Sequence, residues 1–402
     1  MLKTIKEHLQ RQANVFIIGR PGSGKTTLAW TVCKQMHGES FKGQKWYVKA
    51  STSVTRLPDD KAMTLILLLD GQFENAWTTD KMVEKVLDEL KYLRDNLPSK
   101  KVLTIATLSK EAYGRISKYS CIEKLQTMEI INLDGKRNTL TTAEMTNVLE
   151  THNIFVKNVR EANESNVLSQ KQLQGMYDCL NNHEKKAIKS PKIGFPLIAS
   201  LMSLNSPFIG NINFVKEPLK LICESIKRLR ESSDPIDKNK YCTIVYASWK
   251  WGYVDTDNVD QDLLTKIGEH HGHPGAEIDP EFYVLRKRTA TIYEFLHESL
   301  LRAIFAAYGT HYMGFVIEHC PLLVLLEYSV SQREKYISDA EKVFFLTIGG
   351  IVYEEDLVRR IRDGNVDIRH HRIWEQNGFQ ELYKKIYAEG DVSNKYINME
   401  SL

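Results

Sequence analysis

The sequence predicts an α/β fold in which a parallel sheet flanked by helices is followed by a largely helical part. Three observations lead to this prediction. Over the first 135 residues, short apolar runs alternate with helical patterns, which is typical of βαβ units. The first apolar run leads through a glycine-rich loop directly into a helix. Beyond residue 135 the apolar runs give way to helical patterns and one hairpin.

Five strands are predicted in the first part of the chain. They are the apolar runs 15–18, 46–50, 64–69, 101–107 and 128–132. Helices are expected over 2–12, 25–37 and 80–96. The run 64–69 is apolar throughout, as in a strand that is buried on both faces. In such a sheet a ligand binds at the carboxyl ends of the strands.

The loop from Gly19 to Thr27 carries the chemistry. Its sequence, Gly-Arg-Pro-Gly-Ser-Gly-Lys-Thr-Thr between a strand and a helix, is the Walker A pattern in its proper context. The loop amides and the helix N-terminus bind phosphate, Lys25 reaches the β- and γ-phosphates, and Thr26 offers a hydroxyl to Mg²⁺. The sequence therefore predicts binding of ATP or ADP with Mg²⁺ in a P-loop domain. The predicted binding residues of the loop are Gly19, Pro21, Gly22, Ser23, Gly24, Lys25, Thr26 and Thr27.

Asp70 directly follows the apolar run 64–69 and has the place of a Walker B aspartate. Its carboxylate is the second predicted ligand of Mg²⁺, and Lys25 and Asp70 are the residues expected to act in hydrolysis. Many P-loop hydrolases carry a second acid at the next position, which is Gly71 here; Glu74 is the nearest carboxylate. Thr107 could contact the γ-phosphate but lacks the charge of an arginine. We therefore expect slow or weak ATP hydrolysis.

After residue 135 the patterns are mainly helical. Helices are predicted over 142–152, where Thr141 and Glu144 form a capping box, and then over 170–187, 195–204 and 215–232. A small helical unit follows at 241–249 and 263–267, then a hairpin at 283–288 and 291–295, and a helix from His297 to about 308. We expect a P-loop domain over 1–135, a helical domain over 136–210, a winged-helix-like domain over 211–310 and a helical C-terminal region over 311–402.

The composition argues against a nucleic-acid-binding, secreted or membrane-spanning protein. The 402 residues include 54 basic and 51 acidic side chains, with a net charge of +3. This balance lacks the excess of basic residues that is typical of nucleic-acid-binding proteins. The 6 cysteines form no CxxC pair, as is typical of reduced thiols in a cytosolic protein. The N-terminus lacks the apolar segment of a signal peptide. We expect a cytoplasmic protein without a membrane span and with no clear nucleic-acid site.

Four features, in this order, resemble the STAND class of signal-transduction NTPases: Gly19–Thr27, Leu65–Asp70, the Gly-Phe-Pro-Leu stretch at 194–197, and Tyr293–Ser299. Within that class the chain looks most like the animal novel STAND NTPase 3 domain, over roughly residues 1–310. The resemblance implies that Pro196 packs near the adenine of the nucleotide. It also implies that His297 touches the β-phosphate of ADP and locks a closed state. The usual paired acids after the third strand are replaced by Asp70 and Gly71, and the arginine often found after the fourth strand is absent.

The favoured hypothesis is an ATP/ADP-controlled switch in intracellular signalling, for instance in innate immunity or cell death. Such a switch would self-associate and engage other signalling proteins when ATP replaces ADP. The alternative is a small-molecule or nucleoside kinase with the same P-loop, although Arg115, Arg137 and Arg160 are scattered and form no lid-like cluster. A nucleic-acid motor lacks a basic channel, and an inactive scaffold does not fit the intact Lys25 and Thr26. The histidines of 270–273 and 369–372 are expected in solvated loops and not in a metal site.

Overall fold

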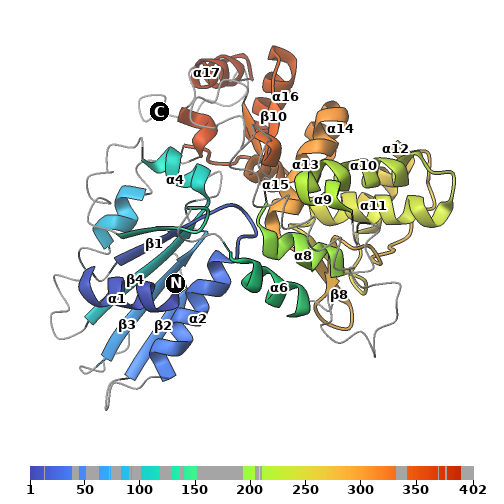
Figure 1. The fold of residues 1–402 in the computed structure, drawn as a ribbon. Helices are drawn as coiled ribbons and strands as arrows, with labels where there is room; N and C mark the ends of the chain where they lie inside the picture. Colours follow the sequence, from blue (N-terminus) through green and yellow to red (C-terminus); the bar gives the residue numbers. More distant parts are fainter. Residues whose placement is uncertain are drawn as a thin grey trace, which may run out of the picture.

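The computed structural model describes most of the chain, with gaps between the described segments. Those segments are 1–12, 14–38, 45–50, 63–71, 73, 83–89, 92, 101–117, 129–135, 140–151, 193–203, 208, 211–331, 342–369, 371–375 and 378–390. Figure 1 shows the parallel sheet in blue and teal on one side, with the green to red elements of the later sequence on the other. The helix expected over 80–96 is described only in part, with 83–89 helical. The helix expected over 170–187 lies outside the described residues.

The sheet contains the five predicted strands. They are β1 (Asn14–Ile18), β2 (Lys45–Ala50), β3 (Met63–Asp70), β4 (Lys101–Leu108) and β5 (Glu129–Asn132). Their order is β2-β3-β4-β1-β5, and every pair is parallel. Strand β4 lies between β1 and β3, where Thr107 pairs with Asp70 on one side and with Ile17 on the other. The order therefore brings the ends of these three strands together, beside the loop that follows β1.

Helices cover both faces of the sheet. On one face, α1 (Leu2–Gln12) and α2 (Lys25–Gly38) pack on Val15 and Ile17 of β1. On the other face, Phe16 and Ile18 pack with residues from the helical segment 83–89 and from α4 (Lys110–Ile116). Successive side chains of a strand point to opposite faces, so the uninterrupted apolar run of β1 supplies both cores.

The second part of the chain is helical with one small sheet. Its helices are α6 (Thr142–Thr151), α8 (Phe195–Ser203), α9 (Ile212–Lys216), α10 (Pro218–Glu231), α11 (Pro235–Trp249), α12 (Gln261–His270) and α13 (Glu298–His311). The strands β6 (Tyr253–Asp255), β7 (Leu285–Lys287) and β8 (Ile292–Phe295) form an antiparallel sheet in the order β6-β8-β7. The predicted hairpin is β7–β8, and together with α10 to α12 it gives the winged-helix-like arrangement.

One predicted helix is divided in the structure. The segment 215–232 contains the end of α9 and all of α10, with Glu217 between them and Pro218 at the first position of α10. Proline has no backbone N–H and fits the first turn of a helix, so it favours a new helix over the continuation of the old one.

The C-terminal part packs on the same core. It consists of α14 (Met313–His319), α15 (Leu322–Tyr328), β9 (Ser329–Ser331), β10 (Leu346–Ile348), α16 (Ile351–Asp363) and α17 (Phe379–Gly390), with short 3₁₀ turns at Lys342–Phe344 and Arg372–Glu375. Helices alone are expected from the sequence here, but β9 and β10 form a parallel pair. A single apolar cluster runs from Met145 in α6 to Ile386 in α17.

Two features of the described residues bear on membranes and metals. No single described helix is long and apolar enough to cross a bilayer; α13 and α14 reach the required length and hydropathy only as a pair, bent by 113°. In the same residues there is no group of three or more metal-ligating side chains.

The position of His371 differs from the expectation. The sequence predicts a solvated loop, but the residue is fully buried and its Nε2 pairs with the Leu326 carbonyl oxygen at 3.1 Å.

Candidate functional site

The glycine-rich loop follows β1, and hydrogen bonds hold its start to the ends of the two neighbouring strands, β4 and β5. The Gly19 N–H donates to the Leu108 carbonyl oxygen at 3.2 Å, and the Leu133 N–H donates to that of Ile18 at 2.7 Å. Gly22 and Gly24 have φ angles of +70° and +86°, a region that side chains disfavour. The glycines at these positions therefore permit the turn of the loop.

The side chain of Lys25 lies inside the curve of this loop. Its Nζ donates to the carbonyl oxygens of Gly19 and Arg20, both at 3.0 Å, and the residue is 9% exposed. The hydroxyl of Ser23 is buried nearby and has no hydrogen-bond partner among the described residues. An ammonium group and an unsatisfied hydroxyl in one loop at the start of α2 are suited to phosphate oxygens.

Asp70 and Thr26 face each other at the end of β3. The Thr26 hydroxyl donates to Asp70 Oδ1 at 2.8 Å, and the Thr107 hydroxyl donates to the same oxygen. The Gly71 N–H donates in turn to Thr107 Oγ1 at 3.2 Å. A carboxylate and a hydroxyl in contact are hard oxygen ligands, so this pair fits Mg²⁺. The contact of Thr107 with Asp70 makes it a neighbour of the metal ligand, a role that its sequence position alone did not reveal.

The Gly-Phe-Pro-Leu stretch at the start of α8 packs directly on the loop. The Gly194 N–H donates to the Pro21 carbonyl oxygen at 2.7 Å, and the Leu197 N–H donates to that of Gly22 at 3.3 Å. A Cβ atom on Gly194 would lie 2.5 Å from the Ser23 Cα, which no side chain tolerates. Pro196 is half-buried beside the loop, and a Cβ on Gly24 would lie 3.9 Å from its Cγ. The two segments are thus in contact over their backbones, although 170 residues separate Gly24 from Gly194.

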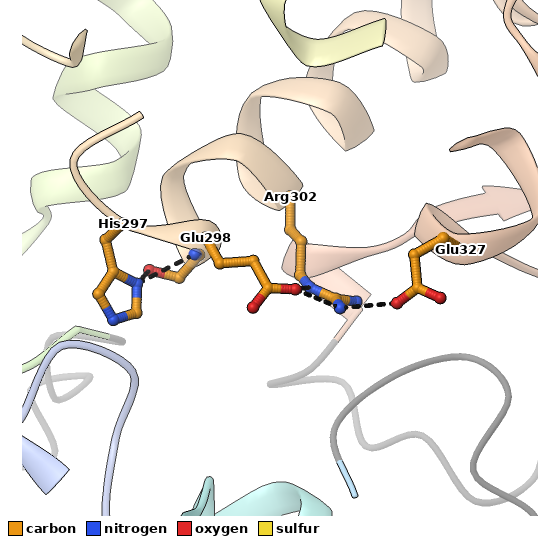
Figure 2. Close-up of polar contacts among 5 residues, drawn as sticks. His297, Glu298, Arg302 and Glu327 are labelled. Carbon is orange, nitrogen blue, oxygen red and sulfur yellow. Dashed lines mark hydrogen bonds and ion pairs between the residues drawn. The ribbon is translucent and has the colours of Figure 1, made fainter. Parts of the chain in front are cut away.

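His297 is the N-cap of α13. Its Nδ1 accepts hydrogen bonds from the Ser299 N–H at 3.1 Å and from the Ser299 hydroxyl at 2.9 Å. Because a backbone N–H can only donate, Nδ1 is the acceptor and the proton of the neutral ring lies on Nε2. Figure 2 shows the imidazole at the start of α13.

The pKa of His297 responds to charges of the loop and of β3. Burial lowers its pKa to about 4, and the positive charge of Lys25 lowers it as well. The carboxylates of Glu298 and Asp70 oppose this change. His297 therefore lies within electrostatic reach of both Lys25 and Asp70, and its ring is neutral near pH 7.

Residues 1–155 match the family model described as Novel STAND NTPase 3. The matched part contains the loop and Asp70, so the resemblance stated from the sequence is confirmed for this part of the chain. Gly194 and His297 lie beyond it. With the geometry of the loop, the match supports a nucleotide-binding P-loop domain in this part of the chain.

Comparison with solved structures gives distant similarities. The ORC2 protein of Aeropyrum pernix, described in ADPNP-ADP complexes, is 10% identical, with a TM-score of 0.34 over 78% of this chain and 93% of that protein. Cdc6p of Pyrobaculum aerophilum is 12% identical, with a TM-score of 0.29 over 80% and 94%. No curated protein is significantly similar in sequence.

The structure brings most of the predicted site residues together, and it adds others. Thr27 is exposed in the first turn of α2, where its carbonyl oxygen accepts a hydrogen bond from Thr31 at 2.7 Å. Glu74 lies outside the described residues. Asp134 was missed: it accepts the Arg20 N–H at 2.8 Å and lies 3.7 Å from Arg20 Nε. No pattern in the sequence links β5 to the loop, so only the strand order reveals this anchor.

A cavity of about 240 Å³ lies elsewhere in the structure, between α10, α11 and α13. Its walls include Tyr241, Ile304 and Tyr308, and none of the predicted nucleotide ligands contributes to them. The cavity is therefore separate from the nucleotide site.

Proposed function

We propose that the chain is a nucleotide-controlled switch of cytoplasmic signalling, closed with ADP and released by ATP. One observation carries the proposal: two stretches distant in sequence from the phosphate-binding loop lie at it or within electrostatic reach of it. They are the start of α8, where the backbone of Gly194 contacts the loop, and His297 at the start of α13. A ligand bound at the loop would contact both stretches, so its identity can decide whether they stay together.

Residues of the loop would hold the phosphates. Lys25 would turn its ammonium from the carbonyl oxygens of Gly19 and Arg20 toward the phosphate oxygens. Thr26 and Asp70 would hold Mg²⁺, which neutralises phosphate charge when it is bound. Pro196 is proposed to pack against the adenine, in keeping with its place beside Gly24.

The imidazole of His297 would distinguish the two nucleotides. Its Nε2–H is the donor left for a β-phosphate oxygen, because Nδ1 is already engaged by Ser299. A ligand shifts an equilibrium only through contacts that differ between the states. The proposed contact exists only while α13 stays close to the loop, and it would therefore favour the closed state.

Weak ATP hydrolysis is part of the proposal. The position after Asp70 is Gly71, which has a φ angle of +64° and no side chain to orient a water molecule. Asp70 itself already accepts hydrogen bonds from Thr26 and Thr107. The nucleotide is therefore proposed to be held more than turned over, and release of α13 would open surfaces for self-association and for other signalling proteins.

Identification of the nucleotide that copurifies with the protein tests this function. We expect denatured wild-type protein to release ADP, measured by chromatography. The variant Lys25→Ala should release none, because the phosphates lose the ammonium group inside the loop. Lys34→Ala, which changes an exposed lysine farther along α2, is the matched control and should retain ADP. Absence of bound nucleotide from wild type, together with equal ADP affinities of wild type and Lys25→Ala, would exclude the proposed switch.

A further inference from the structure

We infer, building on the proposed function, that Arg302 is a positioning residue that couples the nucleotide site to the C-terminal part of the chain. Arg302 holds Glu298, the first residue of α13, and Glu327 of α15 at the same time. It thereby fixes the turn that presents His297 to the loop, and it makes the position of that turn depend on α15.

The contacts of Arg302 are direct on both sides. Its Nε and Nη2 donate to Glu298 Oε1 at 3.0 and 2.6 Å, and its Nη2 also donates to Glu327 Oε1 at 3.0 Å. Figure 2 shows the guanidinium between the two carboxylates, with His297 beside Glu298. One cation thus joins the first turn of α13 to the end of α15.

Burial makes the bond between Arg302 and Glu327 costly to break, whereas the Glu298 side chain at the other end of the junction is 58% exposed. The Arg302 side chain is 8% exposed and that of Glu327 is 10% exposed. The guanidinium also lies 5.1 Å from the ring centres of Tyr328 and Phe345. Removal of one partner from a buried ion pair leaves a charge without compensation, which is strongly destabilising. The network therefore favours an arrangement in which both acids and both rings are in place.

The first turn of α13 carries this constraint to the nucleotide site. Glu298 directly follows His297, and the next residue, Ser299, holds the imidazole through two hydrogen bonds. The charge of Arg302 is the largest effect lowering the pKa of Glu298, so this carboxylate stays ionised and paired. A shift of Arg302 would therefore pass through Glu298 to His297, which lies within electrostatic reach of Lys25 and Asp70.

The other end of the network belongs wholly to the C-terminal part. Glu327 and Tyr328 end α15, and Phe345 immediately precedes β10. If this part leaves α13, Arg302 loses Glu327 and both aromatic rings at once. Coupling between two sites is reciprocal, so ADP held by His297 should strengthen the docking of α15, and the docking of α15 should slow the release of ADP.

The test measures ADP dissociation from the full chain. Glu327→Gln keeps the shape of the side chain and removes its charge, and Arg302→Met removes the cation. We expect each to release fluorescent ADP about tenfold faster than wild type, within the usual range of coupling between sites. Glu327→Gln keeps the test decisive if Arg302→Met does not fold.

Arg360→Met is the matched control. Arg360 lies on α16 and donates to the carbonyl oxygens of Ile317 and Cys320, so this variant also loses a partly buried arginine of the C-terminal part, but the bonds of Arg302 to Glu298 and Glu327 stay in place. Among the described residues, Arg360 makes no hydrogen bond to the first turn of α13, and ADP should leave this variant at a rate within about twofold of wild type.

Hydrogen exchange of residues 322–328 and 346–348 supplies a second readout. ADP should slow exchange there in wild type and have no such effect in Arg302→Met or Glu327→Gln. Equal ADP dissociation from Glu327→Gln and Arg360→Met, or exchange at these residues that does not respond to ADP in wild type, would overturn the coupling while leaving the switch intact. A wild-type protein that binds no ADP would overturn the proposed function itself and this coupling with it.

Discussion

The imidazole of His297 is neutral in the ligand-free protein, because burial and the charge of Lys25 hold its pKa at about 4. Phosphate oxygens of a bound nucleotide would add negative charge beside the ring. That charge favours the protonated form and raises the pKa in the complex above its value in the free protein. Nucleotide binding and proton uptake should therefore be linked at this residue.

The first prediction concerns this linkage. Between the pKa of about 4 in the free protein and the higher pKa in the complex, the complex holds more protons, so ADP affinity should rise as pH falls through this window. Calorimetry in buffers of different ionisation enthalpy should show proton uptake by wild type. His297→Ala should show less uptake, faster ADP release and more spontaneous oligomer. Identical proton uptake by both proteins would rule out the assigned contact.

The second prediction concerns the packing of Gly194 on the loop. Gly194→Ala would place a methyl group 2.5 Å from the Ser23 Cα, so either the loop or α8 must shift. We expect loss of nucleotide binding and a free energy of unfolding lower by about 1–3 kcal/mol, measured by nucleotide titration and chemical denaturation. Gly114→Ala is the control: it adds a methyl group in α4 with no atom within 4 Å, and it should leave binding unchanged. Normal ADP affinity in Gly194→Ala would show that the contact has no role in shaping the loop.

At the scale of single elements, the N-terminus of α6 has the capping box that the sequence of residues 141–144 predicts. The Glu144 N–H donates to the Thr141 hydroxyl at 3.3 Å, and the Thr141 N–H donates to Glu144 Oε2 at 2.8 Å. These reciprocal bonds are the capping box predicted from the sequence. The bond from the Thr141 N–H is the main cause of a lowered pKa at Glu144, so its contribution to stability is present above the usual carboxylate pKa and is lost as pH falls.

The third prediction follows from this cap. Thr141→Ala should reduce the opening free energy of α6 by about 1 kcal/mol near pH 7, because it removes the acceptor of the Glu144 N–H. Hydrogen exchange of the amides in α6 measures this opening. The control is Thr151→Ala, which removes only a bond to the Asn147 carbonyl oxygen at the other end of the helix. Equal protection of α6 in the two variants would contradict the role of the cap.

The elements also show what could be predicted from the sequence. The longest strands of the parallel sheet, β3 and β4, contain apolar runs, and the predicted bounds of all five strands lie within two residues of those in the structure. By contrast, β6, β9 and β10 have 3 residues each, which is too short for a periodic pattern. The helical spacing of Glu298 and Arg302 is visible in the sequence, but Glu327 joins them only through tertiary packing.

The residues of the nucleotide site likewise divide into those that the sequence predicts and those that only the tertiary structure reveals. The residues of the loop and Asp70 are recognisable because their chemistry fixes their spacing in the chain. Asp134 has no such spacing, and it reaches the site through the order of the strands. Thr107 is a candidate from its place after the fourth predicted strand, but its bond to Asp70 is evident only in the structure. His371 lies beside an arginine in the sequence, yet it is buried through its bond to α15, an environment that local polarity does not reveal.

At the scale of the whole molecule, histidines packed inside the second part should make the fold sensitive to acid. His271 is half-buried, with its Nε2 3.0 Å from the Tyr308 hydroxyl and the Tyr241 ring edge-on at 4.8 Å. Burial is the main cause that lowers its pKa to about 4, and His270 and Arg230 add to the effect. The group thus takes up a proton more readily in the unfolded chain than in the folded one.

The fourth prediction gives the direction of this effect. Between the ordinary histidine pKa of about 6.5 and the folded value of about 4, the unfolded chain binds more protons, so the free energy of unfolding should fall as pH falls. The melting temperature measured from pH 7 to pH 4 should decline less steeply in His271→Gln than in wild type. An unchanged slope in the variant would mean that His271 is not one of the groups responsible.

The packing of Gly194 on the loop has a mechanical consequence for any opening of the protein. The start of α8 has backbone bonds to Pro21 and Gly22 on one side, with no room for a side chain between them. On the other side, Ile198 and Leu201 of α8 pack in the apolar cluster of the second part of the chain. A movement that carries His297 away from Lys25 must therefore either break the bonds of α8 to the loop or separate α8 from that cluster.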